Sequence, residues 1–294
     1  MPRSASARES VALRANAAST IGPRLKVFIA DNLGPIVDAA FARSATLTRA
    51  EAALALYAFA FQIYCDFSGY TDIARGTAKL LGFDFALNFR RPYFARNPSD
   101  FWQRWHISLS SWLRDYLYIP LGGNKRGSLI TLRNLFLTML LGGLWHGASW
   151  TFVIWGAYHG ALLVVHRLLK PALSKLEPPG GVASGAWTVT RCSVMFHLAV
   201  LGWLPFRARS LTEIRDVLAG LVQRPGSLGE AQYMGKWLVT CTLLLVLLEL
   251  AEELRPHFLD RRQFWTRGLV YATVIASIMI AGAPGGQTFI YFQF

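Results

Sequence analysis

The sequence has 294 residues, of which 53% are hydrophobic and 16% are charged. Soluble domains usually carry about 25% charged residues, so this composition excludes an ordinary soluble globular protein. Its 30 basic residues exceed its 17 acidic ones, as expected for membrane proteins with basic cytoplasmic loops, and we expect no nucleic-acid partner.

Apolar stretches approach the length needed to cross a bilayer, which is about 20 residues in a helix. In chain order, the predicted spans are Ala52–Cys65 (extendable through Thr48), Leu129–Trp145, Trp150–Leu168, Thr188–Phe206, Trp237–Leu250 and Gly268–Ala283. Val27–Ala42 is a weaker amphipathic candidate, interrupted by Asp31, Pro35 and Asp38. The pattern predicts an all-α, polytopic transmembrane helical bundle with five or six spans.

The stretch from residue 74 to residue 126 has a different composition. It contains nine basic and three acidic residues, a net charge of +6, together with several Trp and Tyr residues. Aromatic and basic side chains gather at membrane–water interfaces. This stretch therefore predicts interfacial helices on the cytoplasmic side.

The domain organisation is simple. Residues 1–22 are rich in Ser, Ala and Arg and have no apolar core, so they predict a flexible N-terminus and not a secretory signal. No repeat or second domain is evident after them. We expect residues 23–294 to form a single membrane domain.

His146 is the strongest catalytic candidate. Apolar residues flank it on both sides, and Gly142, Gly143 and Gly147 allow a substrate or backbone to approach closely. An ionisable residue inside a span is costly and often functional. The alternative is a structural histidine that bonds a neighbouring carbonyl group.

The other histidines do not indicate a metal site. His159 and His166 are seven residues apart (166 − 159), which is about 10 Å along a helix and too far for two ligands of one zinc ion. The three cysteines form no CxxC pair and resemble small buried hydrophobes. We expect neither a metal nor a cofactor.

Several other site types are missing from the sequence. It contains no GxSxG, HExxH or Walker A motif. No conspicuous cluster of carboxylates lies within a span, which argues against an ion-coupled transporter. Asp66 and Asp72, near a span end, are the best acidic candidates and are interpreted as structural.

Four long motifs resemble the membrane-bound O-acyltransferase family, in particular its bacterial branch of alginate O-acetyltransferases and teichoic acid D-alanyl transferases. They are Gln62–Asp72 (QIYCDFSGYTD), Asn88–Tyr93 (NFRRPY), Phe101–Asn124 with its FWQRWHISLS start, and Gly142–Ala148 (GGLWHGA). The closing FIYFQF is similar as well. Members of this branch are usually longer at the N-terminus, so we expect a fragment, a mis-started reading frame or a truncated homologue.

The resemblance implies a helical bundle around a central tunnel, in a bacterial inner membrane. It identifies His146 as the catalytic histidine and His106, 40 residues earlier (146 − 106), as the second signature position. The expected reaction is O-acyl transfer from a cytoplasmic thioester, with acetyl-CoA as the expected donor substrate. The acceptor would be a hydroxyl of an exported polysaccharide such as alginate, or a periplasmic carrier, with periplasmic acetylation proteins as partners.

The corresponding hypothesis for the mechanism makes His146, neutral in an apolar tunnel, the general base for the hydroxyl. His106 would orient the thioester or donate a hydrogen bond to the oxyanion. A basic set would attract the donor's phosphates: Arg90, Arg91, Arg104 and Arg114. An acyl-enzyme route, an inactive membrane scaffold and an acyl or lipid transporter stay open as alternatives.

Overall fold

The computed structural model describes residues 24–226 and 229–255, with isolated positions between 265 and 279. Within these residues every regular element is a helix, which confirms the predicted all-α fold. The chain divides into two compact units. One comprises the described residues up to Ala86 together with the described residues from Ala219 onward, and the other is Leu87–Leu218. The single domain expected over residues 23–294 stays a prediction.

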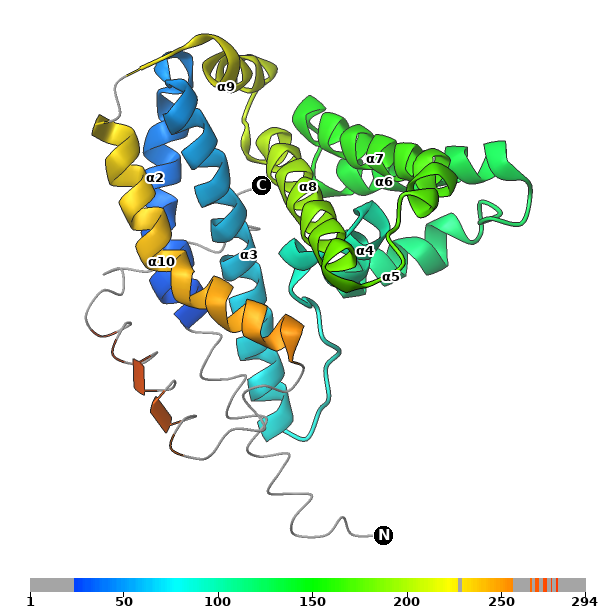
Figure 1. Cartoon of the computed structure of the whole chain (residues 1–294), viewed down its shortest axis with the longest axis horizontal. Coiled ribbons are helices and arrows are strands. Elements are labelled where there is room, and N and C mark those ends of the chain that lie inside the picture. Colours follow the sequence, from blue (N-terminus) through cyan, green and yellow to red (C-terminus); the bar gives the residue numbers. More distant parts are fainter. Residues whose placement is uncertain are drawn as a thin grey trace. The chain divides into compact units, whose positions relative to one another are not determined.

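In the first unit, long helices pack along one another (Figure 1). Its elements are η1 (Arg24–Ala30), α2 (Asp31–Ala42), η2 (Ser44–Thr46), α3 (Arg49–Leu80) and α10 (Gly229–Leu254). α3 begins where Thr48 and Glu51 cap each other: the Glu51 carboxylate accepts the Thr48 backbone N–H at 2.8 Å. Lys26 of η1 forms ion pairs with the buried carboxylates of Asp31 in α2 and Asp66 in α3, at 2.5 Å and 2.8 Å.

The second unit contains short helices followed by three long ones. The short elements are η3 (Pro92–Phe94), α4 (Pro98–Arg104), α5 (Ile107–Leu113) and η4 (Arg114–Tyr118). The long ones are α6 (Ser128–His146), α7 (Trp150–Lys175) and α8 (Gly181–Arg207). The helix α9 (Leu211–Gln223) follows at the boundary between the units. The basic aromatic stretch thus contains several short helices, and their place at the cytoplasmic membrane interface stays a prediction.

Four described helices are long and apolar enough to cross a membrane, judged by length and composition. They are α6, α7, α8 and α10, which contain four of the predicted spans. α3 is not among them, although it contains Ala52–Cys65. Its apolar part continues directly into Asp66, Ser68, Thr71 and Asp72, and the span expected there stays a prediction. The prediction for Gly268–Ala283 lies outside the continuously described residues.

α6 and α7 approach each other closely because glycines line their contact (Figure 1). A Cβ at Gly143 would lie 2.3 Å from the Phe152 carbonyl oxygen, and one at Gly156 would lie 2.5 Å from the Met139 carbonyl oxygen. Small residues at such contacts are typical of helix pairs in membranes, where dispersion replaces the hydrophobic effect as the driving force. This contact fixes the end of α6, where His146 lies.

Candidate functional site

His146 is the last residue of α6, at the turn into α7. Gly147 follows it, and the Ser149 hydroxyl caps α7 by accepting the Thr151 backbone N–H at 3.3 Å. A Cβ at Gly147 would lie 2.8 Å from the Phe152 ring, so this turn requires the glycine. The glycines noted in the sequence therefore allow the end of α6 to lie close to α7. The imidazole of His146 is half-buried there.

Aromatic rings surround the His146 imidazole. The ring centroids of Trp155 and Phe206 each lie 5.1 Å from it, edge to face, and that of Trp145 lies 5.0 Å away. Phe206 is 1% exposed and Trp155 is 3% exposed, whereas Trp145 is 58% exposed. The imidazole thus has a rigid, apolar side toward α7 and α8 and an accessible side toward Trp145.

His106 occupies an unusual backbone conformation between α4 and α5. Its φ of 43° lies in the left-handed region, which non-glycine residues seldom adopt. Two backbone hydrogen bonds hold this turn: Arg90 N–H donates to the Arg104 carbonyl oxygen, and Ile107 N–H donates to the Asn88 carbonyl oxygen, both at 2.9 Å. Strained residues held by their surroundings are frequent at functional sites.

The side chain of Asn88 fixes the imidazole of His106. Its Oδ1 accepts the Ser108 backbone N–H at 3.1 Å and the Ser108 hydroxyl at 3.0 Å, which identifies this atom as the amide oxygen. The same oxygen lies 3.3 Å from His106 Nδ1. An oxygen acceptor favours a proton on Nδ1, so the neutral imidazole presents Nε2 as a lone pair.

The two histidines are electrostatic neighbours within the second unit. The pKa of His106 is lowered to about 3, mainly by burial and further by the positive charge that His146 would carry. His106 is therefore neutral at physiological pH. The structure brings together the two histidines that the sequence predicted as the site, which are 40 residues apart (146 − 106).

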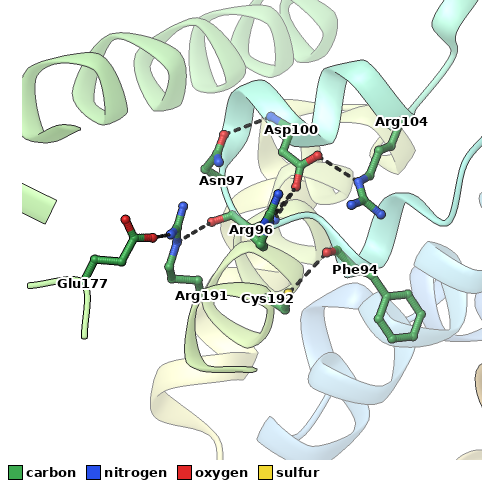
Figure 2. A network of polar contacts seen from close by, with 8 residues as sticks. All are labelled: Phe94, Arg96, Asn97, Asp100, Arg104, Glu177, Arg191 and Cys192. Atoms are coloured by element: carbon green, nitrogen blue, oxygen red, sulfur yellow. Dashed lines mark hydrogen bonds and ion pairs between the residues drawn. The ribbon is translucent and has the colours of Figure 1, made fainter. Parts of the chain in front are cut away.

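A polar network holds α4, the helix that leads to His106 (Figure 2). Asn97 caps α4 by accepting the Asp100 N–H at 2.9 Å, and Asp100 accepts Arg104 Nε–H at 2.8 Å. Burial alone would raise the pKa of Asp100, but hydrogen bonds from Arg96 and Arg104 outweigh it and lower that pKa.

The network extends to α8, where Arg191 Nε–H donates to the Arg96 carbonyl oxygen at 3.4 Å (Figure 2). Arg191 also pairs with Glu177 at 2.6 Å. The thiol of Cys192 donates to the Phe94 carbonyl oxygen at 3.2 Å. α8 is thus tied to the segment that carries the turn at His106.

The arginines predicted to attract donor phosphates differ in their surroundings. Arg104 pairs with Asp100, and the exposed Arg114 pairs with Asp115 at 2.7 Å, so part of their charge is neutralised by the chain itself. Arg90 is exposed, and Arg91 lies in the left-handed region with a φ of 44°. Donor binding by these four residues stays a prediction.

Sequence reasoning did not single out Asn88 and Trp155, which contact His106 and His146. Asn88 opens the NFRRPY motif, which was the available signal for it, whereas Trp155 lies in an apolar span without any distinguishing pattern. The described residues hold no group of three His, Cys, Asp or Glu side chains suited to a metal ion. His159 instead stacks on Phe101, with ring centroids 6.1 Å apart.

Comparison with known proteins identifies the family of this chain. The profile of the membrane-bound O-acyltransferase family matches residues 20–201. A probable alginate O-acetylase of Pseudomonas putida is 40% identical over 92% of this chain and 58% of its own length. A peptidoglycan O-acetyltransferase of Helicobacter pylori is 44% identical over 69% of this chain and 37% of its own length.

A teichoic acid D-alanyltransferase of Bacillus subtilis is 30% identical over 53% of this chain and 41% of its own length. The chain thus spans between 37% and 58% of the length of these three relatives. The matched region includes both histidines and the helices α6 and α7 with their apolar character. The chain is an integral membrane protein that belongs to the membrane-bound O-acyltransferase family.

Proposed function

We propose that this chain carries the catalytic centre of a membrane O-acyltransferase. The main support is a neutral His106 that interacts electrostatically with His146, which ends the first helix of the closely packed α6–α7 pair. Neutral imidazoles can accept protons from hydroxyl groups, and relatives named as O-acetyltransferases support an acyl-transfer reaction. Family membership alone would not distinguish a chemical role for these two side chains.

In the proposed reaction, His146 takes the proton of the acceptor hydroxyl while the hydroxyl oxygen attacks the carbonyl carbon of an acyl thioester. A C–O bond forms, and the tetrahedral intermediate then collapses with loss of the C–S bond. The imidazolium returns the proton to the departing sulfur, so the products are an ester and a free thiol. A positioned general base of this kind contributes about 10²- to 10⁴-fold to the rate.

His106 has an accepting role in this mechanism. Because its proton lies on Nδ1 toward Asn88, Nε2 can accept a hydrogen bond from an N–H or O–H group of a substrate. This tautomer favours the first of the two roles expected for His106, orientation of a substrate, and donation of a hydrogen bond to the oxyanion stays a prediction. We infer that His106 orients a substrate and that His146 performs the proton transfer.

The substrates follow from chemistry and from the relatives. We propose acetyl-CoA, a cytoplasmic thioester, as the donor, and hydroxyls of an exported polysaccharide such as alginate, or a periplasmic carrier, as the acceptor. The Pseudomonas relative named as a probable alginate O-acetylase supports the polysaccharide. The proposed location is a bacterial inner membrane, with periplasmic acetylation proteins as partners, and the exposed Arg90 as a contact for donor phosphate.

The test is an acyl-transfer assay on the full chain in lipid vesicles. Acetyl-CoA with a labelled acetyl group is supplied outside, with alginate oligosaccharides on either side, and mass spectrometry detects esters and free thiol. An ester formed in equal amount to the thiol supports the proposal. If neither ester nor free thiol forms with any acceptor, the proposal is contradicted and an inactive membrane scaffold is favoured. Movement of intact acyl groups across the vesicle without any ester would favour the transporter alternative.

A further inference from the structure

A cluster of aromatic rings beside His146 contains buried nitrogen atoms without hydrogen-bond partners. Among the described residues they are Nε1 of Trp102, Trp155 and Trp203 and Nε2 of His159. These side chains come from α4, α7 and α8, and their rings contact one another: Trp155 lies 5.0 Å from His159 and 5.8 Å from Trp102. One connected cluster thus holds several unused polar groups.

Indole nitrogens can only donate hydrogen bonds, so this cluster lacks an oxygen acceptor. A buried N–H group without a partner is costly, and phenylalanine would fill the same apolar volume without that cost. An oxygen of a bound substrate would supply the acceptor that these donors lack within the described residues.

The position of Trp155 distinguishes it from the other three residues. Among the described ring contacts, it is the member of this set that touches the His146 imidazole, edge to face with centroids 5.1 Å apart. His159 Nε2 is closed off by the backbone of α8, because a Cβ at Gly202 would lie 2.9 Å from it. Trp203 is 0% exposed. Trp155 is thus the residue of this set whose indole ring contacts the proposed base.

We propose that the Trp155 indole N–H donates a hydrogen bond to the carbonyl oxygen of the acyl donor, as a further catalytic residue. This inference rests on the proposed acyl transfer. When the hydroxyl attacks the carbonyl carbon, that oxygen gains negative charge, and it loses this charge when the C–S bond breaks. A fixed donor in a dry, apolar surrounding stabilises such an oxyanion strongly.

The electrostatics of the site favour a donor other than the two histidines. His106 has its proton on the Nδ1 side toward Asn88, and His146 has to be unprotonated to act as a base. At the moment of attack the N–H of His106 is directed toward Asn88, and the base nitrogen of His146 has no proton to donate. Trp155 carries an N–H that does not titrate, so its donor is present at every pH at which the base works.

The decisive variant is Trp155→Phe, which keeps a ring against His146 and removes the N–H. Trp203→Phe is the matched control, because it removes another buried, unpartnered indole N–H from the same cluster, 6.4 Å from Trp155 by ring centroids. Acetyl transfer is measured on the full chain in vesicles, with kcat and KM determined separately. We expect Trp155→Phe to lower kcat by about 10²- to 10³-fold with little change in KM, and Trp203→Phe to stay within about threefold.

A second variant separates the hydrogen bond from packing. Replacement of Trp155 by 3-benzothienylalanine keeps the shape of the indole and exchanges the N–H for sulfur, and it should reproduce the kcat loss of Trp155→Phe. Activity within threefold of the wild type in this variant overturns the role of Trp155. Equal losses in Trp155→Phe and Trp203→Phe, with the sulfur analogue active, overturn it as well, because packing would then explain both.

The outcome for Trp155 is distinguishable from the outcome for the proposed function. An inactive wild-type chain with all acyl donors contradicts acyl transfer itself, and the proposal for Trp155 falls with it. An active wild type that depends on His146 but tolerates both Trp155 variants leaves the function standing and removes the indole from the mechanism.

Discussion

Asn88 Oδ1 lies 3.3 Å from Nδ1 of His106, across 18 residues of sequence. The two residues face each other because the segment at Asn88 runs beside the turn at His106, held by a backbone hydrogen bond from Ile107 to Asn88. The amide oxygen of Asn88 favours a proton on the Nδ1 atom that faces it. The contact with Asn88 also orients the imidazole of His106, whose backbone is strained.

Asn88→Ala should impair catalysis through His106. Loss of the amide oxygen frees both the imidazole and the Ser108 groups that share it. We expect kcat to fall by about 10- to 100-fold, because small misplacements of catalytic groups have effects of that size. Ser108→Ala, which leaves the contact between Asn88 and His106 in place, is the control and should cost less. Equal activity of Asn88→Ala and the wild type would show that His106 needs no such anchor.

The pH behaviour of His106 follows from its lowered pKa of about 3. The unfolded chain binds a proton at this residue near pH 6.5, so between about pH 6.5 and 3 the unfolded state binds more protons than the folded one. Stability should therefore fall with decreasing pH in this window, by at most about 1.4 kcal/mol per pH unit from this residue.

Thermal unfolding of His106→Gln and wild type, compared at pH 7 and pH 5, measures this contribution. The variant should lose less stability than the wild type on acidification. In ¹⁵N NMR spectra of the wild type, His106 should show a neutral imidazole with a protonated Nδ1 at both pH values. A His106 signal that titrates near pH 6.5 would contradict the buried, neutral state.

Gly143→Ala should disturb the contact between α6 and α7. The added Cβ would lie 2.3 Å from the Phe152 carbonyl oxygen, so the helices have to separate. We expect a loss of about 1–3 kcal/mol in the free energy of unfolding, with reduced activity because His146 ends α6.

Gly185→Ala provides the control for this effect, because it lies in α8 and a Cβ there meets no atom within 4 Å. It should stabilise the chain by up to about 1 kcal/mol through helix propensity. Both are measured by thermal unfolding in detergent. Similar stability of Gly143→Ala and Gly185→Ala would argue against the close helix contact.

Asp100→Asn tests the network that holds α4. The variant removes the charge that pairs with Arg104, and we expect it to lower stability at pH 7 by about 1–3 kcal/mol. The pKa of Asp100 is lowered in the folded state from 3.8, so its contribution is present above pH 3.8 and disappears as the pH falls through the folded value. Unfolding curves of the two proteins should therefore converge below pH 3.8; a constant difference would assign the effect to packing.

The length and composition of the apolar runs made most of the helices predictable. Runs such as Leu129–Trp145 and Trp150–Leu168 have the length and composition of spans, and they coincide with α6 and α7. The span at Ala52–Cys65 stays a prediction, because this stretch belongs to a helix of 32 residues that also contains buried polar residues such as Asp66 and Ser68. A helix that is apolar at one end and polar at the other cannot be recognised from the apolar end alone.

The site was predictable only where a motif marked it. His146 and His106 stand in motifs that resemble the family, so both were found, although their proximity depends on packing between segments distant in sequence. The tautomer of His106 was not predictable, since it depends on a left-handed turn and on an amide 18 residues away. Trp155 was missed because a buried tryptophan in a span looks the same whether or not its N–H has a partner.

The central claim is that His146 is the base for acyl transfer, and the rate of His146→Ala tests it most directly. The full chain and this variant are reconstituted in vesicles at equal amounts, with unfolding temperatures measured to exclude loss of structure, and ester formation from labelled acetyl-CoA is followed. We predict a loss of at least about 100-fold in kcat for the folded variant, in the range typical of a positioned base. A folded His146→Ala that forms ester at more than about a third of the wild-type rate would contradict the account.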